Sequence, residues 1–404
     1  MRQRWFTLTQ EGHHWVAAAL FREGQLEMGL VSLEQMNKHG FQTRSWLSDL
    51  AIYTLSENGE FDYAMQIVKD RMANGDLLIS KSVWWHLLDH ASSAFHYIVT
   101  CYCWKSQVNP GYLNPSSGTC LNVLTTAAQA GDVNLATEVF SVLGKRGTVF
   151  QAIHYELLLT TYLNADSPDL RAAFTVLTIM TSVKLEITTA TTRPLLQHLL
   201  DHPKKAIEAF EILTSLNEAN RPVPIAALNV VIEANAYNEN LAQALIVYKA
   251  MHTFERQTRP QPHKPLANVE TFNLLLRCAH HVSPPAYQTA IFLVSEMLAL
   301  DIKPDTATYH RLILVCLKVG NHEHAWRYFD EMDSLGFKPE PQTAHRLARQ
   351  LALIGDGRCW DVLQRLQDHG ALSSYSKRGI EKAWVEWEKS SSPTPTDERA
   401  LGNA

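Results

Sequence analysis

A unit of 35 residues recurs along this sequence, and it constrains the possible folds more than any other feature. Its clearest copy runs from Thr306 to Glu340. The first half ends at Gly320 and the second at Gly336, and glycine commonly stops a helix. The apolar residues at helical spacing are Leu312, Ile313, Val315 and Cys316 in the first half, and Ala325, Phe329 and Met332 in the second. The unit therefore predicts two antiparallel amphipathic helices, with Thr308 near the N-cap of the first.

Copies of this unit cover most of the chain. The clearer ones begin at Val269, Ile225, Ala152 and Ser117, and less regular ones cover residues 9–80, 81–116 and 191–221. A single helical hairpin cannot bury its own apolar face, whereas stacked hairpins bury these faces against one another. The sequence therefore predicts an all-α solenoid over residues 9–370, made of about nine stacked helix-turn-helix repeats.

Four segments depart from the repeat. Residues 255–267 are rich in proline and basic side chains, and they predict a loop between two repeats. Residues 371–389 predict a C-terminal capping helix, and residues 390–404 a disordered tail. Residues 1–8 contain two arginines and no acid, which is compatible with the remnant of a targeting segment.

The charge and the cysteines narrow the class of protein. The formal net charge is −5, which disfavours a protein that coats nucleic acid through positive charge alone. The six cysteines include no Cys-x-x-Cys pair, so we expect neither a zinc site nor a disulfide framework, and a reducing compartment fits better. We interpret them as small buried apolar residues. No apolar run reaches the ~18 residues that span a bilayer.

Motifs of enzymes are missing from the sequence. It contains no Gly-x-x-x-x-Gly-Lys loop and no Gly-x-Ser-x-Gly turn. His322 and His324 are only two residues apart, so a helix would direct them to different sides and they could not share a metal. We therefore expect a protein without catalytic residues, bound metal or cofactor.

The repeat resembles the pentatricopeptide repeat. It shares the period of 35 residues, an alanine in the middle, a methionine seven residues later, and then glycine and a Pro-Asp or Pro-Glu pair. The tetratricopeptide repeat has a period of about 34 residues and a Trp-Leu-Gly-Tyr pattern that these units lack. The resemblance is strongest over residues 269–340. It implies a right-handed superhelix that binds single-stranded RNA in mitochondria or chloroplasts, and we expect a mitochondrial location.

The resemblance also implies which residues contact RNA. In the family, the fifth residue of a unit and the last residue before the next unit read one base together. The matching pairs here are Asn273 with Asp305, Asn229 with Asn268, and His310 with Glu340. The family pattern associates the first pair with uridine and the second with pyrimidines, and it gives no clear base for the third. Basic residues of the first helices, which the family turns toward the concave side, would hold phosphates: Arg277, Arg311 and Lys318.

Two interpretations of the function remain open at this point. The first is an organellar single-stranded RNA-binding protein that acts in mitochondrial transcript stabilisation, processing or translation. The second is a helical-repeat scaffold for protein partners, such as a ribosome-associated or complex-assembly factor. Departures from the family favour the second: Glu270 and Ala307 replace the Val-like second residue, and the asparagines could simply cap helices. The fifth residues of earlier units are Glu156, Leu121, Asp49 and His14, which match no code.

Overall fold

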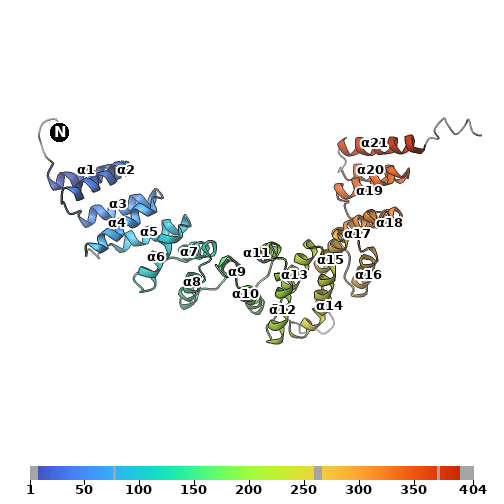
Figure 1. Cartoon of the computed structure of the whole chain (residues 1–404), viewed down its shortest axis with the longest axis horizontal. Coiled ribbons are helices and arrows are strands. Elements are labelled where there is room, and N and C mark those ends of the chain that lie inside the picture. Colours follow the sequence, from blue (N-terminus) through green and yellow to red (C-terminus); the bar gives the residue numbers. More distant parts are fainter. Residues whose placement is uncertain (1–7, 76–78, 259–265, 371–373, 392–404) are drawn as a thin grey trace, which may run out of the picture. The chain divides into compact units, whose positions relative to one another are not determined.

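The chain folds into α-helices that follow one another in pairs. The structure is a computed structural model that describes residues 8–75, 79–258, 266–370 and 374–391. These residues contain twenty-one α-helices and no β-strand, which confirms the prediction of an all-α repeat fold (Figure 1). They form ten helix pairs, against the nine or so expected from the sequence, and one final helix.

Each pair consists of a first helix and a second helix, and these two terms are kept below. The first helices are α1 (Gln10–Arg22), α3 (Ser45–Glu57), α5 (Lys81–Ser93), α7 (Ser117–Ala130), α9 (Ala152–Asn164), α11 (Thr189–Asp201), α13 (Ile225–Tyr237), α15 (Val269–His281), α17 (Thr306–Val319) and α19 (Pro341–Leu353). The second helices are α2 (Leu26–Lys38), α4 (Phe61–Ala73), α6 (Tyr97–Cys103), α8 (Val133–Lys145), α10 (Leu170–Ser182), α12 (Lys205–Glu218), α14 (Leu241–Thr258), α16 (Tyr287–Ala299), α18 (His322–Ser334) and α20 (Arg358–Asp368). A π-helical turn, η2 (Trp104–Val108), continues α6, and the final helix is α21 (Ser374–Ser391).

The chain divides into two compact units, residues 1–176 and 177–404. Within each unit, consecutive first helices pack against one another, and most first helices also pack against their own second helix. Alanines such as Ala17, Ala51 and Ala91 on the first helices are fully buried. Because alanine fills little space, the backbones of neighbouring helices can approach closely.

The pair α17 and α18 shows how the repeat pattern becomes a core. Ile313 and Cys316 from α17 and Phe329 and Met332 from α18 belong to one buried cluster. Gly320 ends α17 in the left-handed conformation with a φ of 79°, as a helix-stopping glycine should. The two helices and their apolar faces predicted from the sequence are therefore confirmed.

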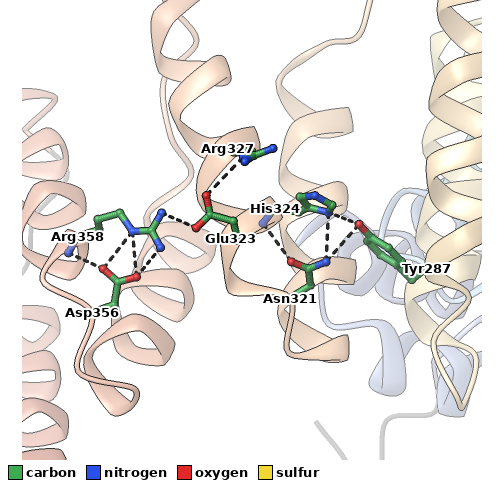
Figure 2. Close-up of polar contacts among 7 residues, drawn as sticks. All are labelled: Tyr287, Asn321, Glu323, His324, Arg327, Asp356 and Arg358. Atoms are coloured by element: carbon green, nitrogen blue, oxygen red, sulfur yellow. Dashed lines mark hydrogen bonds and ion pairs between the residues drawn. The ribbon is translucent and has the colours of Figure 1, made fainter.

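Polar contacts join consecutive second helices at their N-terminal ends. Asn321 is the N-cap of α18 and accepts a hydrogen bond from the backbone N–H of His324. Its amide nitrogen lies 3.4 Å from the hydroxyl of Tyr287 on α16, which also contacts His324 (Figure 2). In the other unit the hydroxyl of Tyr97 on α6 donates to Asp132, the N-cap of α8, at 2.9 Å. The two units thus use the same device to align successive second helices.

An ion-pair network extends the contact from α18 to α20. The guanidinium of Arg358 lies 2.9 Å from Glu323 on α18 and 2.6 Å from Asp356, in the turn before α20 (Figure 2). These groups are partly exposed, so the network orients the helices more than it stabilises them.

Histidines join consecutive first helices. The ring of His310 on α17 accepts a hydrogen bond through Nε2 from the backbone N–H of Glu340, the N-cap of α19, at 3.1 Å. His14 on α1 accepts in the same way from the N–H of Arg44, the N-cap of α3, at 3.2 Å. Because the acceptor nitrogen must carry no proton, both contacts require a neutral ring.

Two segments outside the repeats can be compared with the sequence-based prediction. α14 continues to Thr258, four residues into the segment 255–267 that predicted a loop. The first proline of that segment is Pro260, and nothing before it stops a helix. At the other end, α21 packs against α19 and buries Ile380 and Ala383. Residues 1–7, 259–265 and 392–404 lie outside the described residues, and so do most of the predicted targeting segment, loop and tail.

Gly131 allows us to test how tightly the repeats stack. It has a φ of 71°, and a Cβ at this position would lie 2.2 Å from the carbonyl oxygen of Asn164 on α9. In Gly131→Ala, the strain of a positive φ and the overlap of the new Cβ with this oxygen should together lower the free energy of unfolding by about 2–4 kcal/mol. Gly147 has nearly the same φ of 69° but no atom within 4 Å, so Gly147→Ala should cost only about 1–2 kcal/mol. Urea unfolding of both variants measures the difference, and equal losses would contradict this packing.

The His310 contact predicts a dependence of stability on pH. Burial lowers the pKa of His310, and although Glu340 opposes this shift, Arg311 adds to it. Because the unfolded ring titrates near 6.5, the unfolded chain binds a proton first as the pH falls. We expect His310 to reduce the free energy of unfolding progressively below about pH 6.5. His310→Gln, whose amide oxygen can also accept from Glu340, should make this fall shallower in urea unfolding between about pH 7 and pH 5. A variant with the wild-type pH profile would contradict the role of the ring.

Candidate nucleic-acid interface

An open groove of about 940 Å³ follows four consecutive first helices, α11, α13, α15 and α17. All of it lies within residues 177–404. Its lining includes six of the nine residues that the resemblance assigned to RNA contact: Asn229, Asn268, Asn273, Asp305, Arg277 and Arg311. The structure therefore gathers most of the predicted site residues on one surface.

The last residue before each of these helices is its N-cap. Asp305 caps α17: its Oδ1 accepts from the backbone N–H of Thr308 at 2.8 Å, and the Thr308 hydroxyl accepts from the N–H of Asp305 at 3.2 Å. Asn268 caps α15 through Thr271 in the same reciprocal way. The sequence placed Thr308 near the N-cap, whereas the cap itself is Asp305 and Thr308 is the third residue of the helix.

The amide of Asn273 joins α15 to the cap of α17. Its Nδ2 lies 3.1 and 3.2 Å from the two carboxylate oxygens of Asp305, and its Oδ1 accepts from the Thr308 hydroxyl at 2.9 Å. Burial would raise the pKa of Asp305, but the hydrogen bonds from Asn273 and Thr308 outweigh it and hold the pKa below its usual value. The carboxylate is therefore ionised at neutral pH and fixes the orientation of the amide, because it can only accept.

Asn229 repeats this arrangement one unit earlier. Its Oδ1 accepts from the hydroxyl of Thr271 at 2.8 Å, and its Nδ2 lies 3.3 Å from Oδ1 of Asn268. One feature differs, since the carboxylate of Glu270 also lies 3.5 Å from this Nδ2. Asn229 and Asn273 are nearly buried, with 4% and 6% of their surface exposed, so only an edge of each amide faces the groove.

The two arginines of the groove differ in how they are paired. Arg277 forms an ion pair with Glu233 at 3.3 Å, and its guanidinium lies 3.9 Å from the centre of the Tyr237 ring. Nη1 of Arg311 is buried and has no hydrogen-bond partner among the described residues. Burial, followed by the charge of Arg277, lowers the pKa of Arg311, whereas Asp305 and Glu233 oppose this. A buried cation without a full set of partners favours binding of an anion.

Three predicted site residues lie outside the groove lining. The ammonium of Lys318 donates to the carbonyl oxygens of His280, His281 and Val282 at 2.7, 3.2 and 3.3 Å, so it caps the C-terminal end of α15. Three bonds use all of its protons, which leaves no donor for a phosphate. His310 and Glu340 form the contact between α17 and α19 described above, with His310 as an acceptor.

Sequence reasoning named Thr308 but missed that a threonine recurs at this position in other repeats. A threonine occupies the third position of five first helices, where it bonds to the cap or to the preceding repeat: Thr119, Thr191, Thr271, Thr308 and Thr343. This periodicity is visible in the sequence and could have identified them. Among the described residues there is no cluster of three or more side chains suited to hold a metal.

Charges of both signs border the groove. Arg193, Arg277 and Arg311 are balanced by Glu233, Glu270 and Asp305. The lining is therefore neither a continuous positive stripe nor an apolar channel. No helix in the described part of the chain has the length and hydropathy needed to cross a membrane.

Two family models and several known proteins match this chain. One model, described as a pentatricopeptide repeat-containing protein, matches residues 117–251, and a second, described as a pentatricopeptide repeat domain, matches residues 292–343. The mitochondrial 15S rRNA processing factor CCM1 of Lachancea thermotolerans is 25% identical over 82% of this chain and 36% of its own length. The mitochondrial 15S rRNA processing factor ppr3 of Schizosaccharomyces japonicus is 28% identical over 34% of this chain and 19% of its own length.

A further relative and one solved structure complete the comparison. A pentatricopeptide repeat-containing protein of Arabidopsis thaliana is 38% identical over 16% of this chain and 11% of its own length. The chain thus spans little more than a third, at most, of the length of the curated relatives named here. The crystal structure of the pentatricopeptide repeat protein PPR10 from maize matches with a TM-score of 0.47 and 16% identity, over 99% of this chain and 60% of that one. The matched family models and the paired helices with their repeat pattern agree: the chain carries pentatricopeptide repeats, which the models match over residues 117–251 and 292–343.

Proposed function

We propose that this chain is a mitochondrial single-stranded RNA-binding protein that acts in RNA processing, transcript stabilisation or translation. In this proposal it binds RNA without carrying out a catalytic step. Two relatives named as mitochondrial 15S rRNA processing factors support both the location and the kind of RNA process. The observation that carries the proposal is the amide of Asn273, held by Asp305 and Thr308 at the edge of a groove that also contains Arg311.

The geometry of Asn273 suits recognition of a base edge. A side-chain amide has two N–H donors and a carbonyl with two lone pairs. Asp305 accepts from one N–H of the Asn273 amide, and the Thr308 hydroxyl donates to one lone pair of its oxygen. The other N–H and the other lone pair of Asn273 remain available. An adjacent donor and acceptor match the Watson–Crick edge of an unpaired pyrimidine. Within this proposal, Asn273 with Asp305 reads a base and Arg311 contacts a phosphate.

A helical scaffold for protein partners is the second candidate, and a different surface favours it. Large aromatic side chains are exposed on the first helices α1, α3 and α5: Trp15 at 61%, Trp46 at 36%, Tyr53 at 42% and Trp85 at 44%. Exposed tryptophan and tyrosine are typical of protein interfaces. The balanced charge of the groove agrees with this candidate as well. A chain that binds no single-stranded RNA at any salt concentration would leave the scaffold as the function.

Replacing Asn273 tests the base-reading role. Asn273→Ala should weaken binding to a pyrimidine-rich oligonucleotide roughly tenfold, equivalent to about 1.4 kcal/mol, and should reduce the preference for pyrimidine at one nucleotide. The cap of α17 survives in this variant, because Asp305 still accepts from the N–H of Thr308. Asn235→Ala is the matched control, since Asn235 is equally buried but bonds only to Val231 within α13. Fluorescence anisotropy titrations measure the affinities, and equal affinity of both variants would refute the assignment.

Replacing Arg311 tests the phosphate contact. Arg311→Gln should weaken binding to all oligonucleotide sequences about equally, and it should reduce the slope of log affinity against log salt by about 0.7 for a single strand. Arg327→Gln is the control, because Arg327 lies on the second helix α18, is 69% exposed and pairs only with Glu323. A slope unchanged in Arg311→Gln would remove Arg311 from the RNA contact.

A further inference from the structure

The two asparagines of the groove have almost the same surroundings. Each bonds to the N-cap of the next first helix and to the threonine at the third position of that helix. The second position differs, since it holds Glu270 in α15 and Ala307 in α17. Both residues line the groove.

This difference decides whether an amide proton remains available. At Asn229, the nitrogen faces Oδ1 of Asn268 at 3.3 Å and Oε2 of Glu270 at 3.5 Å, so each of its two protons has an acceptor in the protein. At Asn273, the nitrogen lies 3.1 and 3.2 Å from the two oxygens of a single carboxylate, and because these oxygens lie in nearly the same direction, we infer that one N–H serves both. Ala307 has no polar side-chain atom, so the second N–H of Asn273 has no acceptor in its side chain.

The charges around the two amides also favour RNA binding at Asn273 over Asn229. Glu270 and Glu233 both border the groove beside Asn229, close enough that Glu270, after burial, contributes to a raised pKa of Glu233. Beside Asn273, Arg311 lies near Asp305 and helps to stabilise its charge. An approaching phosphate would meet the carboxylate of Glu270 at the first amide, where Glu233 is already paired with Arg277, and the guanidinium of Arg311 near the second.

We propose that Glu270 closes the Asn229 repeat to RNA, because it accepts the amide proton that would otherwise bond to a base. The Asn273 repeat is open and reads a nucleotide, and its neighbour does not. This inference rests on the proposed RNA binding, and it replaces the expectation that both asparagines read bases. It makes the second residue of the following helix a determinant of specificity in this chain.

Reciprocal substitutions test the proposal on oligonucleotides that carry U, C, A or G at successive single positions. Glu270→Ala should create a pyrimidine preference at one further nucleotide, next to the one that Asn273 reads, and should raise affinity roughly fivefold to tenfold. Ala307→Glu should abolish the preference at the Asn273 nucleotide. This variant should still fold, because an acid in the first turn of a helix is favourable. A Glu270→Ala protein without a new preference would overturn the proposal.

A third variant separates hydrogen bonding from charge repulsion. Glu270→Gln loses the charge but keeps an oxygen that can accept the same proton, so it should bind like the wild type and gain no preference. If Glu270→Gln gained the same preference as Glu270→Ala, repulsion would explain the effect and the proposal would be wrong. If the wild-type protein shows a preference at the Asn273 nucleotide and Glu270→Ala gains no further preference, this inference alone is refuted. Wild-type protein that binds no RNA would refute the proposed function as well.

Discussion

The hydrogen bond between one repeat and the cap of the next is the interaction on which the rest of this structure depends. The first helix of a pair begins with orphan N–H groups that need acceptors. Here the N-cap supplies the acceptor, and a side chain from the preceding first helix holds the N-cap. Asn273 does this for Asp305, and Asn229 does it for Asn268. Each such bond both starts a helix and sets its position against its neighbour.

In other repeats a histidine, and not an asparagine, holds the next N-cap residue. His14 and His310 accept a hydrogen bond from the backbone of the next cap residue rather than from its side chain. A ring nitrogen used in this way has no capacity left to read a base. The choice between asparagine and histidine at this position therefore separates repeats that present an amide to the groove from repeats whose histidine ring bonds to the backbone of the next cap.

The sequence predicted the helices well because their signals are local. Apolar residues three and four apart and the glycines that stop helices identify both helices of the repeat from 306 to 340 without any long-range information. The predicted loop after α14 began four residues too early, because it had been defined by its composition and not by a residue that stops a helix. Helix boundaries without a glycine or proline are set by packing, which the sequence shows only indirectly.

The site was predicted less completely, and the reason is physical. The family resemblance placed six residues on the groove, but the bonds that join them to neighbouring repeats span 32 to 44 positions, and no local pattern shows these bonds. Lys318 illustrates the consequence. It looks like a phosphate ligand on a first helix, yet the C-terminal carbonyls of α15 take all of its protons. A basic residue can be assigned to RNA only after the carbonyl groups within its reach are known.

The balanced charge of the groove limits how RNA can be bound there. Three arginines and three acids give little net attraction for a polyanion, so affinity in this groove has to come from individual contacts. Arg311, which lacks a full set of partners, and the amide of Asn273, which retains a donor and an acceptor, are two groups of the groove with unused bonding capacity. In the proposed RNA interface, recognition would depend on a few well-oriented groups, and one carboxylate such as Glu270 would be enough to change which nucleotide is recognised.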